Sequence, residues 1–126
     1  MEIKKFENSL IAFDFESDMI NATDMLKAFP EKKMNNFLRT KQTKDFIDVL
    51  QNNTLKSVIQ VKTGNTGGTW MNKLLAYKFA AWLDPKFELF VYFTFDRFMK
   101  EKFESQQRQL DYFWDKEDIN DIYKKK

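Results

Sequence analysis

The fold is decided between residues 56 and 83, which read KSVIQVKTGNTGGTWMNKLLAYKFAAWL. At the start of this stretch, Ile59 and Val61 alternate with polar residues, which predicts a strand over 56–62. The polar loop 63–68 contains all three glycines of the chain, so a second strand at 69–71 can return antiparallel. Asn72 then caps a helix over 73–83 that is apolar almost all round, a pattern typical of a buried helix.

Upstream of this stretch, the sequence predicts a first hairpin followed by three short helices. Apolar residues alternate from 11 to 15, and residues 3–6 can pair with them across a turn at 7–9. Asn21 caps a first helix over 22–28, which ends before Pro30. A second helix covers 32–40, and a third begins with Thr43 as its N-cap and ends at 52–53.

The composition excludes several classes of chemistry. The chain has 126 residues, the size of one domain, and it contains neither cysteine nor histidine. Thiol nucleophiles, disulfides, Cys/His zinc sites and histidine proton relays are therefore excluded. Asp14 and Glu16 share a strand face without a convergent third acid, so we expect no metal site, no cofactor and no enzymatic activity.

The charge is unevenly distributed along the chain. The formal net charge is only +2, yet residues 27–83 contain ten basic residues and three acidic ones. No carboxylate occurs between Asp48 and Asp84. A basic middle between acidic ends is typical of a polyanion-binding surface, although a solvated lysine-rich face gives the same pattern.

The second predicted helix has two distinct faces. When its apolar residues (Met34, Phe37 and Leu38) face the core, the opposite face presents Lys32, Asn35, Asn36 and Arg39 at i, i+3, i+4 and i+7. Arginine pairs with guanine and asparagine with adenine, while lysine contacts phosphates. Two short helices joined by a proline-containing turn are helix-turn-helix-like, so this face is a candidate for reading DNA; an ordinary solvent face is the alternative.

The glycine-bearing loop matches neither a P-loop nor a dinucleotide fingerprint. Its predicted role is a hairpin tip that approaches a nucleic-acid backbone, with Asn65 and Thr66 donating to phosphates. An ordinary turn is the alternative. The predicted fold class is therefore α+β: short antiparallel hairpins with a helix-turn-helix-like pair, a glycine-tipped wing and two longer packed C-terminal helices. We expect a domain over 1–104 and a charged C-terminal helix or tail over 105–126.

Two groups of residues carry a family resemblance. The first group comprises 20–24, 37–39, 43–47 and Leu50, and the second comprises 68–70, 75–76, 80–83, Pro85, Phe87 and Val91. Together they resemble the KilA-N domain over most of residues 10–100, with Phe37 where the family often has tryptophan. The resemblance implies a DNA-binding module of phages, bacteria and large DNA viruses, similar to the fungal APSES transcription-factor domain.

These observations together predict a non-enzymatic, double-stranded-DNA-binding module of the phage, viral or bacterial regulator type, acting in transcription regulation. The predicted DNA-binding residues are Lys32, Lys33, Asn35, Asn36, Arg39, Lys41, Lys44, Lys62, Asn65, Thr66 and Lys73. The sequence has no apolar run long enough for a membrane span and no signal peptide. We expect a cytoplasmic protein in a bacterial or infected host cell.

Two alternatives remain open at the level of sequence. The first is a protein-interaction module, such as an antirepressor that binds a repressor or self-associates as a homo-oligomer. The aromatic cluster at Tyr112, Phe113 and Trp114 in the charged C-terminal segment motivates it. The second is RNA binding, because charge alone does not distinguish the two nucleic acids.

Overall fold

The computed structural model describes residues 1–64 and 67–117, with side chains described up to residue 112. The elements in chain order are β1 (Glu2–Phe6), β2 (Ser9–Asp14), β3 (Met19–Asn21), α1 (Ala22–Lys27), α2 (Met34–Leu38), α3 (Lys41–Asn52), β4 (Ile59–Lys62), β5 (Gly68–Asn72), α4 (Lys73–Leu83) and α5 (Pro85–Glu117). The predicted α+β class is confirmed, and both predicted hairpins are present.

The strands form one antiparallel sheet in the order β1-β2-β3-β5-β4. Strand β3 was not predicted, because three residues are too few to show an alternation. It connects the two hairpins by pairing with β2 on one side and β5 on the other. The first turn is shorter than predicted: Ser9 pairs with Phe6, so only Glu7 and Asn8 form the loop.

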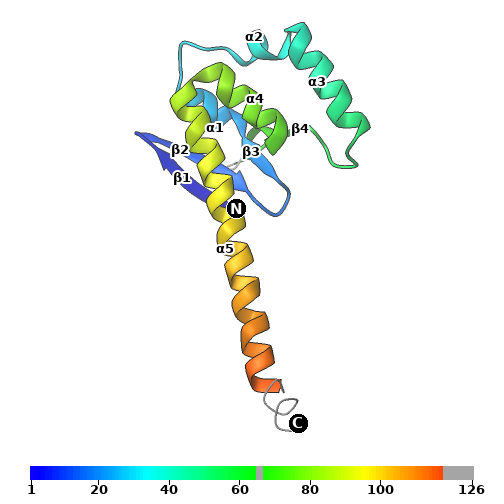
Figure 1. Ribbon diagram of the computed structural model, residues 1–126. Helices are drawn as coiled ribbons and strands as arrows, with labels where there is room; N and C mark the ends of the chain where they lie inside the picture. The colour runs from blue at the N-terminus through cyan, green and yellow to red at the C-terminus, as the bar shows by residue number, and fades with distance from the viewer. Residues whose placement is uncertain (65–66, 118–126) are drawn as a thin grey trace. The chain divides into compact units, whose positions relative to one another are not determined.

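The core lies between the sheet and the helices that cover one of its faces, with α4 and the start of α5 in front of the sheet in Figure 1. Helix α4 contacts the sheet through β3 and β5. The rings of Phe6 and Phe87 lie 4.9 Å apart, and Phe29 from the α1–α2 turn lies 5.3 Å from Phe87. These ring contacts join β1, the α1–α2 turn and α5 within a single aromatic cluster.

Three predictions about the helices are wrong in detail. Helix α2 is only five residues long, because Lys33 is its N-cap and Arg39 its C-cap. Helix α3 is capped by Thr40, whose hydroxyl accepts from the N–H of Thr43; Thr43 itself is buried. Helix α4 is not buried all round, since Leu74 is 44% exposed.

The chain divides into two compact units, Met1–Tyr92 and Phe93–Lys126. The first contains the whole sheet, helices α1–α4 and the first residues of α5. The second contains the remainder of α5. The predicted boundary after residue 104 stays a prediction.

Candidate nucleic-acid interface

The exposed face of α2 is held in place by one buried aromatic residue. Phe37 is 3% exposed, and its ring lies 4.9 Å from Phe79 and 5.6 Å from Trp82, both on α4. With Phe37 directed into the core, Asn35 and Asn36 face solvent from α2. Arg39 is also exposed, at the C-cap.

The basic residues that precede α2 differ in their surroundings. The Lys32 ammonium lies 4.9 Å from the ring centroid of Trp82, so its charge rests on the indole and its side chain is half-buried. Lys33 is exposed at the N-cap of α2. Lys33 is therefore the better placed of the two to reach a ligand in solvent.

Helix α3 presents two further cations. Lys41 lies in its first turn and forms an exposed ion pair with Asp45, with 2.8 Å between Nζ and Oδ2. Lys44 is exposed and has no ion-pair partner among the residues that the structure describes. The two lysines thus provide a matched pair, one engaged by a carboxylate and one not.

The β4–β5 hairpin holds the remaining predicted residues. The Lys62 ammonium lies 4.7 Å from the ring centroid of the buried Trp70. Lys73, at the start of α4, is 3.7 Å from the carboxylate of Asp18. Asn65 and Thr66 lie outside the described residues.

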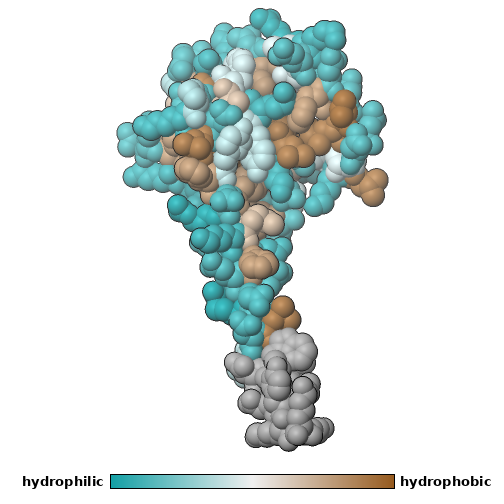
Figure 2. Space-filling model, viewed as in Figure 1, coloured by the Kyte–Doolittle hydropathy of each residue, from teal (hydrophilic) through white to brown (hydrophobic). Residues whose placement is uncertain are grey.

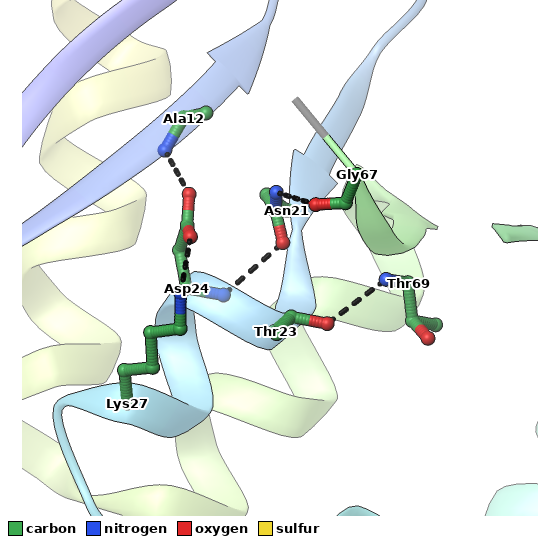
Figure 3. Close-up of polar contacts among 7 residues, drawn as sticks. All are labelled: Ala12, Asn21, Thr23, Asp24, Lys27, Gly67 and Thr69. Carbon is green, nitrogen blue, oxygen red and sulfur yellow. Dashed lines mark hydrogen bonds and ion pairs between the residues drawn. The ribbon is translucent and has the colours of Figure 1, made fainter. Parts of the chain in front are cut away.

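The base of this hairpin is fixed to the N-terminus of α1 by side-chain hydrogen bonds that long-range folding brings together (Figure 3). The Asn21 amide donates to the Gly67 carbonyl over 3.2 Å, while its oxygen accepts from the Asp24 N–H over 3.1 Å. The Thr23 hydroxyl accepts from the Thr69 N–H over 2.9 Å. We call Asn21, Thr23, Asp24, Gly67, Gly68 and Thr69 the Asn21 clamp.

Asp24 extends the Asn21 clamp to the first hairpin. Its carboxylate accepts from the N–H of Ala12 in β2 over 3.0 Å, and the Lys27 ammonium lies 4.0 Å from its other oxygen (Figure 3). Helix α1 is therefore tied to the β4–β5 hairpin at its N-terminus and to β2 by the same turn. Sequence reasoning assigned Asn21 only the cap of α1, which is confirmed, and missed its bond to the hairpin.

The Asn21 clamp leaves no room for a Cβ at Gly67, where it would lie 2.8 Å from the Gly64 carbonyl oxygen, or at Gly68. The φ of Gly68 is +124°, and a Cβ built there would lie 2.9 Å from the Thr23 hydroxyl and 3.1 Å from the Asn21 side-chain oxygen. A side chain would therefore push into the two residues that hold the hairpin. The signal in the sequence is the adjacent pair Gly67-Gly68, which the sequence alone assigns to the hairpin tip.

The described part of the chain contains no cluster of three or more acidic residues that could hold a metal ion. Asp18 contacts Lys56 and Lys73, and Asp24 serves the Asn21 clamp. No described helix has both the length and the apolar character that a membrane span requires. The polar residues thus define a surface of amides and cations beside α2 and α3, carried on a sheet with a pinned hairpin.

Comparisons with known proteins assign this fold to a family. The family model for the KilA-N domain matches residues 4–101, so the chain belongs to the KilA-N domain family. This is a family of DNA-binding domains, not of enzymes. The chain is also similar to protein kilA of Escherichia phage P1, at 39% identity over 59 residues.

That similarity covers 47% of this chain and 22% of the phage protein, so the chain matches about a fifth of its curated relative's length. No solved structure matches the chain. The family model over residues 4–101 therefore fixes the class of module as a KilA-N domain.

Proposed function

We propose that this domain binds double-stranded DNA with the exposed residues of α2 and the first turns of α3. The observation that carries the proposal is the set formed by Asn35, Asn36 and Arg39, which are all solvent-exposed on one short helix and its C-cap. An arginine guanidinium suits the guanine edge and asparagine amides suit adenine. A regulator of the phage, viral or bacterial type needs this kind of base readout to act in transcription.

The proposed reading element is a helix-turn-helix-like pair made of α1 and α2. Pro30 lies in the turn between them. Backbone hydrogen bonds from the Phe29 N–H to the Leu26 carbonyl and from the Lys32 N–H to the Phe29 carbonyl stabilise this turn. Helix α2 would enter a groove, with Phe37 fixing its orientation on α4.

Phosphate contacts would come from the lysines around this element and from the β4–β5 hairpin acting as a wing. Lys33 and Lys44 are exposed, and Lys41 can exchange its surface ion pair for a phosphate at small cost. Lys62, Asn65, Thr66 and Lys73 would serve the wing side, with Lys32 contributing from Trp82. The Asn21 clamp supports this part of the proposal because it gives the hairpin a fixed base.

Fluorescence anisotropy with duplexes selected from a random pool tests the proposal. Arg39→Ala should lose about 1–3 kcal/mol of discrimination at one base position. Arg108→Ala, the same change at an exposed position of α5, is the matched control and should bind like the unmodified chain. Affinity should fall steeply as salt rises to the physiological level, because phosphate contacts release counterions.

Affinity that does not change with salt would contradict the phosphate assignments. Equal loss of affinity from Arg39→Ala and Arg108→Ala would contradict the reading role of α2. A duplex RNA competitor provides the remaining comparison. Stronger competition by duplex RNA than by duplex DNA would assign the surface to RNA.

A second candidate function is a protein-interaction module that works through the C-terminal segment. The exposed side chain of Tyr112 favours it, since a solvent-facing aromatic residue on a charged helix can dock against a partner. The side chains of Phe113 and Trp114 lie outside the described residues. Truncation after Glu104 separates the two functions, because retained DNA binding with lost association would assign association to that segment.

A further inference from the structure

Four large apolar side chains lie exposed along one side of α5 within the second unit. Phe93, Met99, Phe103 and Leu110 are 57%, 51%, 65% and 52% exposed. At about 100° per residue these four positions fall within roughly a third of the helix circumference. We call them the α5 stripe. Figure 2 shows apolar side chains recurring along the described part of this helix, between hydrophilic neighbours.

The α5 stripe has the spacing of a helix-pairing seam. From residue 96 onward, the positions 96, 99, 103, 106 and 110 follow the alternation of three and four that a heptad repeat requires, and Phe93 extends the stripe three residues before Asp96. Asp96 and Gln106 occupy the two intervening seam positions. An apolar face of this kind stabilises a helix mainly when it is packed against another surface, because isolated helices are marginal in water.

Beside the α5 stripe, basic and acidic residues occupy different halves of the helix. On one edge, Arg97 and Lys100 come first and Glu104 and Asp111 follow, all four exposed. This edge is therefore basic in its first half and acidic in its second half. The opposite edge carries Lys102 and Gln109 instead.

An antiparallel arrangement of two copies matches this division. When two such helices pair antiparallel about Phe103, the same edge of each helix faces its counterpart in reverse direction. The basic half, Arg97 and Lys100, then meets the acidic half, Glu104 and Asp111, and the match occurs twice by symmetry. A parallel pair would instead bring this edge toward the Lys102 edge, where no acid is available.

We propose that the α5 stripe is the seam of an antiparallel homodimer, in which a second copy of this chain covers it. The seam from Phe93 to Leu110 is about 27 Å long, because a helix rises about 1.5 Å per residue. A seam of four apolar layers is short for a permanent dimer, so we expect a reversible, concentration-dependent one. The dimer goes beyond the proposed DNA binding, does not depend on it, and would give each assembly two DNA-binding units.

Sedimentation velocity of the full chain over a wide concentration range tests the dimer. The unmodified chain should shift from the mass of one chain to that of two, and Phe103→Glu should stay monomeric at every concentration. Arg108→Glu is the matched control, because Arg108 is exposed on the same helix and five residues place it about 140° around the helix from Phe103. It should dimerise like the unmodified chain.

Cysteine cross-linking tests the direction of the pair, because the chain has no cysteine of its own. Under oxidation, Phe103→Cys should cross-link to itself, whereas Leu110→Cys should not, since the two Leu110 positions lie at opposite ends of an antiparallel seam. Efficient cross-linking of Leu110→Cys would overturn the antiparallel arrangement.

A third pair of variants tests the edge charges. The double change Arg97→Glu with Lys100→Glu should weaken self-association at least tenfold, and so should Glu104→Lys with Asp111→Lys. An equimolar mixture of the two should restore the dimer. A chain that is monomeric throughout, or an Arg108→Glu variant that dissociates as Phe103→Glu does, would overturn the proposal. Binding of Phe103→Glu to a short duplex would be measured separately, so failure of the dimer and failure of DNA binding are distinguishable.

Discussion

The Asn21 clamp and the exposed face of α2 use the same side-chain chemistry for opposite purposes. Asn21 is 3% exposed, and its side-chain amide forms hydrogen bonds within the fold through both its nitrogen, to Gly67, and its oxygen, to Asp24. Asn36, on α2, is exposed and its amide faces solvent. The segments 20–24 and 68–70, which carry part of the family resemblance, therefore hold the base of the β4–β5 hairpin in place. The residues proposed to read DNA lie on a surface that the fold leaves free to vary.

The largest expected effect is at Gly68, where Gly68→Ala should destabilise the first unit by about 3 kcal/mol. The change combines a strained φ of +124° with a Cβ only 2.9 Å from the Thr23 hydroxyl. Gly64→Ala is the control, because Gly64 also has a positive φ, +94°, but its Cβ would meet nothing within 4 Å. Gly64→Ala should cost about 1 kcal/mol in denaturant unfolding. Equal costs would show that strain alone acts at Gly68, and that the close contact with the clamp is unimportant.

The next effect compares the two asparagines directly. Asn21→Ala should lower the free energy of unfolding by about 2 kcal/mol, because it removes the α1 cap and leaves the Gly67 carbonyl without its donor. Asn36→Ala should change stability by less than about 0.5 kcal/mol, as expected for an exposed position. Chemical denaturation of both variants measures the difference. A large loss of stability from Asn36→Ala would place that residue in the fold and remove it from the proposed interface.

Local signals predicted the parts of the fold that depend on neighbouring residues. The alternation at 11–15 and the Asn21 cap were both visible in the sequence. The contact that starts α5 is local in the same way, since the Asp84 carboxylate accepts from the Phe87 N–H over 2.9 Å. The cap of α3 was misassigned because Thr40 and Thr43 are equally good N-caps by type.

Long-range contacts could not be predicted in the same way. The bonds from Asn21 to Gly67 and from Thr69 to Thr23 each span 46 residues, and nothing in either segment alone indicates its partner. Strand β3 exists because β2 and β5 provide edges for it, so its three residues carry little signal of their own. For the candidate site, the sequence identified the residue types on α2 but not the engagement of Lys32, Lys41, Lys62 and Lys73 by other side chains.

The contacts that these lysines form with other side chains lead to a smaller expected effect, on the affinity for DNA. Lys44→Ala should lower affinity less than tenfold for all sequences alike and reduce the slope of log affinity against log salt by about 1. Lys41→Ala should do less, because Lys41 must first leave Asp45, 2.8 Å away. Anisotropy titrations at several salt concentrations measure both. A larger effect at Lys41 than at Lys44 would mean that Asp45 positions Lys41 for the phosphate.

The smallest effect concerns Tyr92. This residue is intermediate between the buried Asn21 clamp and the exposed face of α2, because it is 38% exposed yet has a defined hydrogen-bond partner. Its hydroxyl donates to the Glu88 carboxylate over 2.5 Å, and this bond, together with burial and the nearby negative charge, raises the pKa of Tyr92 from 10.0 to about 12. The folded chain therefore holds this proton more tightly than the unfolded chain does. The stabilisation is present in full below pH 10 and is lost as the pH rises toward 12.

Tyr92→Phe removes that titration. Between about pH 9 and pH 11, the unmodified chain should lose more stability than Tyr92→Phe, by on the order of a few tenths of a kcal/mol because solvent screens the pair. Denaturant unfolding across this range measures the difference, and the tyrosinate absorbance of the two proteins identifies the group that titrates. Glu88→Gln removes the negative partner and should lower the pKa of Tyr92 toward its usual value. If the free energy of unfolding changes with pH in the same way for the unmodified chain and for Tyr92→Phe, the half-exposed Tyr92 hydroxyl contributes no more to stability than the solvent-facing amides of α2. A polar contact would then stabilise this fold only when it is buried as in the Asn21 clamp.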